Sequence, residues 1–363
     1  MTVQHVRHSA SLSYLELPVN IRPKTNYPTV YQQAEDIGGE FTRIRWGLPD
    51  QAIANFSPSL LYHKGHRLLS FRSQPEPFVF RADQKYFYYN NTPTEIYVGE
   101  LVSYDTVAGA KKIRRGPHRL SYEDARLFRA PDDELYIQFI TSSYASKWDS
   151  SKHLLVNQPK VCVGHLNEFA EAEDCIYPPI GENLKPGKPE KNWCFFSDEN
   201  ELKLLYSTLP LKILSPGKPD VEIDSSCLKE VVGESPTFNS TAPIKIGDEW
   251  LVFFHWKYMA LDVTSQTPYL LYHLGCYTLD DKLTKITRRC TEALFSGSIN
   301  DKLIWWTDVT GNPVSKQPAC ILPFGGAYVE EENCIELALG VNDSFMGIFK
   351  CPLVNILALL QTV

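Results

Sequence analysis

Two adjacent carboxylates and a guanidinium, on Glu123, Asp124 and Arg126, stand where one predicted strand begins. A carboxylic acid in such a cluster can protonate the leaving oxygen of a glycosidic bond, as inverting sugar chemistry requires. Asp124 and Arg126 lie two residues apart on a strand, so we expect both side chains on the same face. A structural reading is also open, because a buried Arg–Asp pair can hold a strand end without taking part in chemistry.

Four basic residues from separate segments would suit an oxyanion such as phosphate. They are Arg72, Arg126, Lys191 and His255. Arginine offers forked, bidentate hydrogen bonds, and lysine offers a point charge. The structural alternatives are that Lys191 is a solvent-exposed lysine and that His255 is a core histidine with its hydrogen bonds made.

Further residues at corresponding places could bind a polyhydroxylated ligand. They are Ser57, Glu123, Asn192, Trp193 and Asp343. Carboxylates accept hydrogen bonds from sugar hydroxyls, and an aromatic ring such as Trp193 can stack on the apolar face of a sugar. Asp343 lies in a segment that has the composition of a turn, which is its structural alternative.

Hairpins are expected to position these side chains, because a pattern of strand, tight turn and strand recurs along the chain. The paired strands are predicted at 59–62 with 67–72, 125–128 with 135–139, 193–196 with 202–206, 242–246 with 250–254, and 319–322 and 328–329 with 335–339. Their second strands begin about 67 residues apart on average, which is longer than the about 40–50 residues of tabulated propeller repeats.

A radial arrangement of such hairpins would protect their edges and create a central depression lined by first strands. The sequence therefore predicts an all-β fold, a five-bladed β-propeller with a central active-site mouth. The candidate residues fall at the start of a first strand or the end of a second strand, so five separate segments would deliver them to this mouth. A pair of all-β sandwiches is the structural alternative.

The two ends of the chain are expected to differ from the blades. Residues 1–45 are polar and rich in proline, and we expect an irregular N-terminal arm that packs on the propeller. Residues 46–363 would form the catalytic propeller domain. Residues 353–360 have the apolar spacing of a short C-terminal helix.

Composition narrows the class of protein. The 363 residues are 43% hydrophobic and 12% aromatic, and a net charge of -7 is spread without long runs, which argues against a nucleic-acid-binding face. No run approaches 18 apolar residues, so no membrane span is expected.

Nine cysteines without a C-x-x-C pair favour a reducing, cytoplasmic location over a zinc site. Phosphate-loop and dinucleotide motifs are lacking, so no cofactor or metal is expected; a homo-oligomer stays open.

Several motifs in order resemble the five-bladed propellers of glycoside hydrolase family 130. That family comprises β-mannoside phosphorylases and hydrolases, and related β-mannosyltransferases share its fold. The segments that carry the resemblance are Ser57 with Arg72, Glu123-Asp124-Ala125-Arg126 for a Glu-Asp-Pro-Arg motif, Lys191-Asn192-Trp193 for a Lys-Asn-Trp motif, Ser240 through His255 for a Gly-Thr-Pro to His hairpin, and Gly340 through Asp343 for the last blade. They span about residues 55–360.

The resemblance implies roles for individual residues. Asp124 matches the catalytic aspartate, a general acid thought to act through a sugar hydroxyl, and Asp343 matches a residue that binds the mannosyl ring. The positions that hold phosphate in phosphorylases correspond to Arg72, Arg126, Lys191 and His255. Departures from the pattern suggest a divergent branch; they are Ser57 for Asn, Ala125 for Pro, Ser240 for Gly and Asn342 for Ala.

The predicted function is therefore that of a carbohydrate-active enzyme: a glycoside phosphorylase or glycosyltransferase, with hydrolysis as a further option. It would make or break a β-linked, mannosidic bond with inversion. Its partners would be an oligosaccharide and inorganic phosphate or a sugar phosphate. Two alternatives stay open, a β-glycosyltransferase that uses a nucleotide sugar and a carbohydrate-binding propeller without catalysis.

Overall fold

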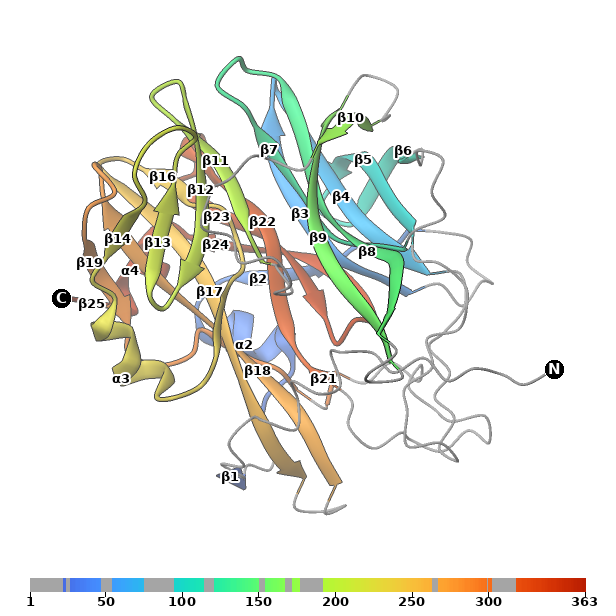
Figure 1. Ribbon diagram of the computed structural model, residues 1–363. Coiled ribbons are helices and arrows are strands. Elements are labelled where there is room, and N and C mark those ends of the chain that lie inside the picture. Colours follow the sequence, from blue (N-terminus) through green and yellow to red (C-terminus); the bar gives the residue numbers. More distant parts are fainter. Residues whose placement is uncertain are drawn as a thin grey trace.

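Strands dominate the computed structural model, which describes residues 22–23, 27–46, 54–74, 95–113, 121–149, 154–166, 172–176, 192–262, 267–298, 300–301 and 318–363. The strands form four sheets of four strands and one sheet of nine (Figure 1). This confirms the prediction of an all-β, propeller-like fold. Within the described residues, no helix is long and apolar enough to cross a membrane.

Three of the four-stranded sheets follow the chain in order, each an antiparallel meander. The first sheet contains β3 (Ala54–His63), β4 (His66–Gln74), β5 (Glu95–Ser103) and β6 (Thr106–Lys112). The second contains β7 (Ser121–Arg129), β8 (Leu135–Asp149), β9 (Leu154–Leu166) and β10 (Ala172–Ile176). The third contains β11 (Cys194–Asp198), β12 (Glu201–Thr208), β13 (Leu211–Leu214) and β14 (Val221–Ile223).

The fourth sheet has nine strands, and two short helices, η1 (Ser226–Leu228) and α3 (Lys229–Val232), precede it. Its centre is the long hairpin of β17 (Glu249–Asp262) and β18 (Thr267–Asp280), which projects beyond the other sheets in Figure 1. The remaining strands are β1 (Arg22–Pro23), β15 (Thr237–Asn239), β16 (Ile244–Ile246), β19 (Ile286–Cys290), β20 (Phe295–Ser296), β21 (Pro318–Ala319) and β25 (Leu360–Thr362).

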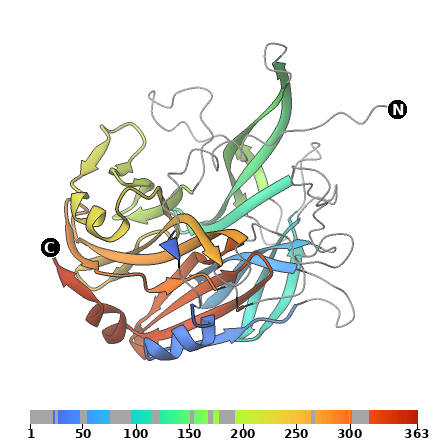
Figure 2. The ribbon, with the colours of Figure 1, turned by 90° about the horizontal axis from the view of Figure 1, so that it is seen from below.

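The fifth sheet joins both ends of the chain. It contains β22 (Ile321–Val329), β23 (Cys334–Val341), β24 (Phe345–Pro352) and, as its outer strand, β2 (Glu40–Arg43). Three short helices flank it in the sequence: α2 (Val30–Asp36), η2 (Glu330–Glu332) and α4 (Leu353–Ala358). Figure 2 shows α2, in blue, beside the red strands of this sheet.

The five predicted hairpins are all present, as β3–β4, β7–β8, β11–β12, β16–β17 and β22–β23. The prediction of a five-bladed propeller is wrong in its number of blades, because four sheets are regular four-stranded blades and the nine-stranded sheet departs from that plan. The two long strands of its hairpin have 14 residues each. Short strands from distant segments pair along this hairpin: β1 pairs with β17, and β20 and β21 pair with β18.

The prediction of an irregular N-terminal arm is wrong for residues 30–43. Thr29 caps α2 in a capping box with Gln32, and the spacing of these two residues can be recognised in the sequence. β2 then pairs with β24 along the edge of the fifth sheet. A short strand of this kind depends on its partner, so local sequence gives little sign of it. The helix predicted at 353–360 is confirmed as α4.

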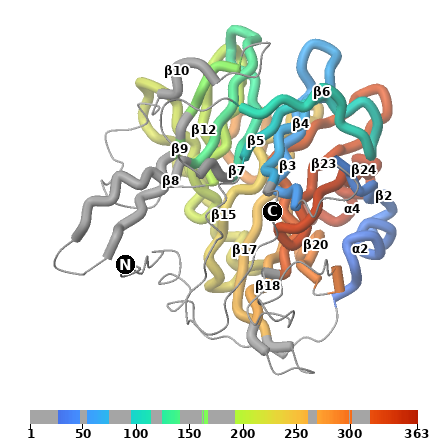
Figure 3. Tube along the Cα trace, turned by 90° about the vertical axis from the view of Figure 1, so that its right-hand side faces the viewer, coloured from blue at the N-terminus to red at the C-terminus, as the bar shows by residue number. Residues whose placement is uncertain are grey.

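The hydrophobic core lies between neighbouring sheets. Five clusters of buried side chains bridge successive pairs, for example Ile96 with Leu127, Phe128 with Phe195, Leu205 with Val252, Phe253 with Leu337, and Ile348 with Leu69. The last pair joins the fifth sheet to the first, so the sheets close into a ring. Figure 3 shows the chain passing from sheet to sheet in colour order.

A buried carboxylate strengthens this closure. Glu336 of β23 is fully buried and accepts hydrogen bonds from Tyr62 Oη (2.7 Å), Arg67 Nη2 (2.9 Å) and Tyr104 Oη (2.6 Å) of the first sheet. The Arg67 guanidinium also lies 4.4 Å from the centre of the Tyr104 ring. We call Glu336, Tyr62, Arg67 and Tyr104 the Glu336 cluster; every oxygen of its carboxylate has a partner.

Candidate active site

Left-handed residues recur near the start of the innermost strands. They are Ser57 (φ 50°), Asp124 (φ 51°) and Asn192 (φ 64°). The register shifts between Phe56 and Ser59 and between Glu123 and Arg126, so Ser57 and Asp124 occupy matching bulges. A left-handed backbone at a residue other than glycine costs about 1–3 kcal/mol, and such strain gathers at functional sites.

The carboxylate of Asp124 faces the first sheet. Its Oδ1 lies 3.5 Å from Arg72 Nη1 and 3.4 Å from Ser57 Oγ. Arg72 is itself buried, and its guanidinium lies 4.6 Å from the centre of the Phe56 ring. The two sheets therefore bring together three residues predicted from the sequence for this site, and both contacts are long enough to rearrange when a ligand binds.

Arg126 does not pair with the carboxylate of Asp124. Its Nη1 donates to the main-chain oxygen of Asp124 (3.3 Å), and its guanidinium lies 4.8 Å from the centre of the Phe324 ring. The bulge turns Asp124 away, which corrects the expectation that strand alternation puts both side chains on one face. The open alternative of a structural Asp124–Arg126 pair is thereby disfavoured.

The Arg126 guanidinium is buried with unused donors. The residue is 3% exposed, and its Nε and Nη2 have no hydrogen-bond partner among the described residues. The nearby Cys194 does not neutralise it, because burial raises the pKa of this thiol, and the opposing effect of the Arg126 charge is smaller. A neutral thiol is only a weak acceptor. Arg126 thus offers a positive charge and two donors to an anion.

Hydrogen bonds continue from Asn192 into the fourth sheet. The main-chain oxygen of Asn192 accepts from Asn239 Nδ2 (3.0 Å), which also donates to the main chain of Leu205 (3.0 Å). Asn239 Oδ1 accepts from Thr208 Oγ1 (2.6 Å). Asn239 is fully engaged and buried, so it holds the start of β11 against β15.

His255 lies next along this path. Its Nδ1 is 2.8 Å from Ser240 Oγ, and its ring is stacked on Phe238 with centroids 5.3 Å apart. Ser240 directly follows Asn239, so His255 lies beside the innermost segment of the fourth sheet. It is buried, with one ring nitrogen held by a hydroxyl. A hydroxyl can donate or accept, so this contact accommodates either form of the imidazole.

The fifth sheet contributes Asp343 through a shared neighbour, the buried Cys320. Burial raises the pKa of the Cys320 thiol well above its usual range, and the charges of Asp343 and Asp124 raise it further. Asp343 and Asp124 therefore both lie close enough to Cys320 to raise the pKa of its thiol. Asn342 holds the turn: its Oδ1 accepts from the Cys320 amide (2.8 Å), and its Nδ2 donates to Ser298 O (2.9 Å).

Three predicted site residues are not placed at the site: one is buried in the core, and the side chains of the other two lie outside the part of the chain that the structure describes. Trp193 is buried in the cluster between the second and third sheets, with its ring 5.6 Å from that of Tyr206, so packing explains its burial. Lys191 lies outside the described residues, as does the side chain of Glu123. Their proposed roles stay predictions.

Asn239, Cys320 and Phe324 are neighbours of the site that the sequence did not single out. A signal existed for Asn239, because it precedes Ser240 as Glu123 precedes Asp124. Phe324 and Cys320 gave none, since they look like ordinary apolar core residues. The described residues hold no group of three or more His, Cys, Asp or Glu side chains that could bind a metal ion. The chemistry that the site can offer is acid–base work at Asp124 and anion binding at Arg126.

Comparison with known proteins gives structural relatives only. No protein-family model and no curated protein sequence matches the chain. A β-1,2-mannobiose phosphorylase from Listeria innocua, in complex with β-1,2-mannobiose, matches with a TM-score of 0.53 at 13% identity, over 88% of this chain and 96% of that one. A mannose phosphorylase from Leishmania mexicana, in complex with a phosphate ion, matches with a TM-score of 0.51 at 11% identity, over 92% and 95%.

A third similar structure is that of a glycosyltransferase. It is a GDP-Man-dependent mannosyltransferase from Leishmania mexicana, with a TM-score of 0.54 at 11% identity, over 89% of this chain and 94% of that one. At such identities the likeness concerns the fold. The resemblance found in the sequence is confirmed at that level: this chain has the propeller-like fold of mannoside phosphorylases and of a mannosyltransferase.

Proposed function

We propose that this protein is a carbohydrate-active enzyme that makes or breaks a β-mannosidic bond with inversion and uses inorganic phosphate or a sugar phosphate. The observation that carries the proposal is the Arg126 guanidinium, buried beside Asp124 with two nitrogens unpaired among the described residues. A buried charge without a partner costs several kcal/mol, on the order of 3–5 when a partner is removed. A bound oxyanion would supply that partner.

In the direction of phosphorolysis, a phosphate oxygen attacks the anomeric carbon of the mannosyl group from the side opposite the leaving sugar. The bond from that carbon to the glycosidic oxygen breaks as the new bond to phosphate forms. The leaving oxygen receives a proton that originates on Asp124 and passes through a sugar hydroxyl. The products are the shortened sugar and an α-configured mannose 1-phosphate, and Asp124 is left as a carboxylate.

The surrounding residues have proposed roles that follow from their positions. Arg72 and Ser57 orient the carboxylate of Asp124, and Arg72 also joins Arg126 and His255 in binding phosphate. Lys191 completes that set, as the family resemblance implies. Asp343 binds hydroxyls of the mannosyl ring, with Glu123, Asn192 and Trp193 as further sugar-binding candidates. No metal or cofactor takes part in this scheme.

Product analysis tests the proposal. The purified protein is incubated with β-1,2-mannobiose and inorganic phosphate, and the reaction is followed by ³¹P and ¹H nuclear magnetic resonance. We expect loss of inorganic phosphate and formation of a mannose 1-phosphate with the α-configuration. A β-configured product would refute inversion. Release of free mannose without phosphate consumption would replace phosphorolysis by hydrolysis.

A second candidate is transfer from a nucleotide sugar, which is supported by the shared fold of a GDP-Man-dependent mannosyltransferase. This candidate predicts release of GDP when GDP-mannose and mannose are supplied, and no need for inorganic phosphate. A carbohydrate-binding propeller without catalysis predicts saturable binding of mannosides with no turnover of either donor. The same set of incubations separates the three functions.

We further propose a reducing, cytoplasmic location. Seven cysteines in the described part of the chain are free, and six of them are buried: Cys194, Cys276, Cys290, Cys320, Cys334 and Cys351. Buried thiols left unpaired are typical of reducing compartments. Thiol titration of the denatured protein, isolated without reductant, tests this location; a substantial fraction of cysteines in disulfides would contradict it.

A further inference from the structure

A second basic side chain, Lys257, lies on the same face of β17 as His255. The two residues are two positions apart in a regular stretch of the strand, so their side chains point to the same side. Lys257 lies opposite Tyr272 of β18, and His255 lies opposite Phe238 of β15. Three strands of the fourth sheet therefore contribute to one cluster, and His255 is its only member that was predicted as a site residue.

Two aromatic rings frame both basic groups. The Lys257 ammonium lies 5.0 Å from the centre of the Phe238 ring and 5.5 Å from that of Tyr272. The His255 ring lies 5.3 Å from Phe238 and 5.9 Å from Tyr272. An ammonium group over aromatic faces is attracted by the ring quadrupole and keeps its full positive charge. The rings thus hold Lys257 in place beside His255.

This cluster is continuous with the candidate site. His255 contacts Ser240, and the preceding Asn239 donates to the main-chain oxygen of Asn192. Asn192 is two residues from Cys194, and the charge of Arg126 lowers the pKa of the Cys194 thiol against the larger effect of burial. Lys257 lies two residues further along β17 than His255 and shares its ring neighbours Phe238 and Tyr272. It is partly exposed, whereas His255 is buried.

We propose that Lys257, together with His255, binds the phosphate group of the co-substrate. The inference rests on the proposed function, because it places Lys257 in the anion subsite of that reaction. A lysine at the exposed edge of the subsite contributes a point charge that reaches a phosphate oxygen not engaged by a forked arginine. Lys257 therefore adds to the affinity for phosphate.

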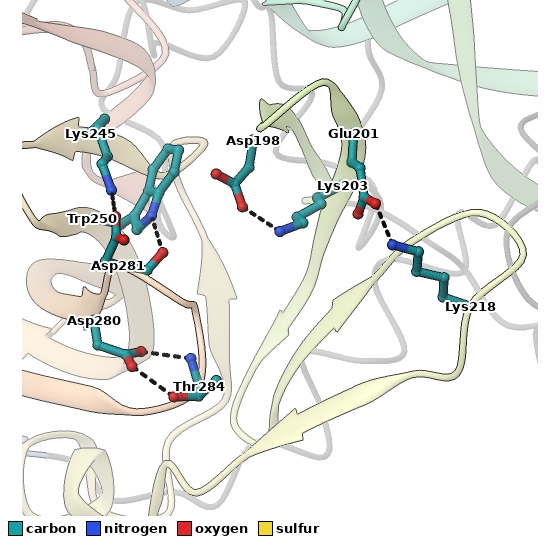
Figure 4. Close-up of polar contacts among 9 residues, drawn as sticks. All are labelled: Asp198, Glu201, Lys203, Lys218, Lys245, Trp250, Asp280, Asp281 and Thr284. Atoms are coloured by element: carbon teal, nitrogen blue, oxygen red, sulfur yellow. Dashed lines mark hydrogen bonds and ion pairs between the residues drawn. The ribbon is translucent and has the colours of Figure 1, made fainter.

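The same sheet offers a matched control, Lys245 of β16. Its ammonium lies 4.7 Å from the centre of the Trp250 ring, so it too rests over an aromatic face. Lys245 is largely exposed and forms an ion pair with Asp281, as Figure 4 shows. Removal of Lys245 therefore tests what the loss of a lysine–aromatic contact does when the candidate site is left untouched.

Phosphate titration by calorimetry tests the inference on the full-length protein. The probes are inorganic phosphate with wild type, Lys257→Met, Lys257→Arg and Lys245→Met. We expect Lys257→Met to weaken phosphate binding about tenfold, as the loss of one charge-assisted contact does. Lys257→Arg should stay within about threefold of wild type because it keeps the charge. Lys245→Met should bind phosphate like wild type.

Turnover separates a binding role from a merely structural one. Lys257→Met should raise KM for phosphate and leave kcat unchanged, because the contact is made equally in the ground and transition states. A Lys257→Met variant with wild-type phosphate affinity overturns the inference. Arg126→Met separates this failure from that of the proposed function: if Arg126→Met loses affinity while Lys257→Met does not, only the role of Lys257 is wrong. A wild type that binds no phosphate overturns both.

Discussion

Two buried charged clusters of this protein differ in how fully they are satisfied. In the Glu336 cluster, both carboxylate oxygens accept short hydrogen bonds from two tyrosines and an arginine. At Arg126, two buried guanidinium nitrogens, Nε and Nη2, have no hydrogen-bond partner among the described residues, whereas in the Glu336 cluster one nitrogen, Arg67 Nε, has none. Each cluster joins different sheets, and both consist of residues distant in sequence.

The difference separates a structural role from a functional one. A buried carboxylate whose two oxygens both accept hydrogen bonds holds sheets together and has no acceptor left to offer a ligand. A buried charge with spare donors destabilises the folded protein until an anion arrives, which is the expected state of a binding site. The Glu336 carboxylate is therefore suited to ring closure, whereas Arg126 is suited to the anion binding that we propose for it.

Asp124→Asn should have the largest effect on activity. Removal of a general acid lowers the rate by about 10²–10⁴-fold, whereas the similar size of asparagine should leave the fold intact. The measurement is kcat for phosphorolysis of a β-mannoside, together with the melting temperature. Wild-type turnover by the Asn variant would show that Asp124 is not the acid. A large drop in melting temperature would show that Asp124 stabilises the fold.

Glu336→Ala should have the largest effect on stability. It leaves Arg67 without its buried partner, and breaking a buried pair costs about 3–5 kcal/mol. The measurement is the free energy of unfolding in urea. Glu100→Ala is the control, because Glu100 pairs with His66 on the exposed surface of the first sheet, where an ion pair contributes about 0–1 kcal/mol. Equal losses in the two variants would contradict the structural role of the Glu336 cluster.

Asp301 is an intermediate case, a buried carboxylate that accepts from the Val30 amide (2.9 Å) at the start of α2. Burial raises the pKa of Asp301 to about 6 from 3.8, so the folded chain holds the proton more tightly than the unfolded chain. The stability from this group is complete below about pH 4 and is lost as the pH rises to about 6.

Asp301→Asn keeps an acceptor for Val30 and removes the titration. The variant should lack this loss, which for wild type is about 3 kcal/mol across that interval. Urea unfolding at several pH values between 4 and 7 measures it. Parallel pH profiles for the two proteins would show that the carboxyl is not titrating in the folded state as expected.

Arg126→Met should have the smallest effect on stability. It removes a buried charge two of whose three nitrogens lack partners among the described residues, so the free energy of unfolding should be unchanged or higher by about 1 kcal/mol. Arg67→Met, the same substitution in the Glu336 cluster, should lower it. Urea unfolding without phosphate compares the two variants. A loss at Arg126 as large as that at Arg67 would show that Arg126 is already satisfied in the folded protein.

The hairpins could be predicted because their determinants are local. Turn residues such as Gly65 and Gly247 separate strands whose apolar residues mark the core. The form of the fourth sheet could not be predicted, because short strands such as β1 and β21 exist only through pairing with the long hairpin. The helix α2 could have been found from its capping box.

The candidate site was partly predictable for a related reason. Its residues lie at matching places in the hairpins, so their common location followed from the repeat. Their partners did not: spacing suggested Asp124 with Arg126, whereas the structure pairs Asp124 with Arg72 from the neighbouring sheet. Trp193 could stack on a sugar by residue type, and the structure buries it between two sheets.

By itself, the sequence determined the strands, their turns and the residues available for chemistry, since these depend on neighbours within one hairpin. The tertiary structure alone decided which charges are paired and which are spare. Glu336 and Arg126 look alike in sequence, as charged residues inside apolar strands. What surrounds each of them comes from another sheet, and that contact is set by how the ring of sheets closes.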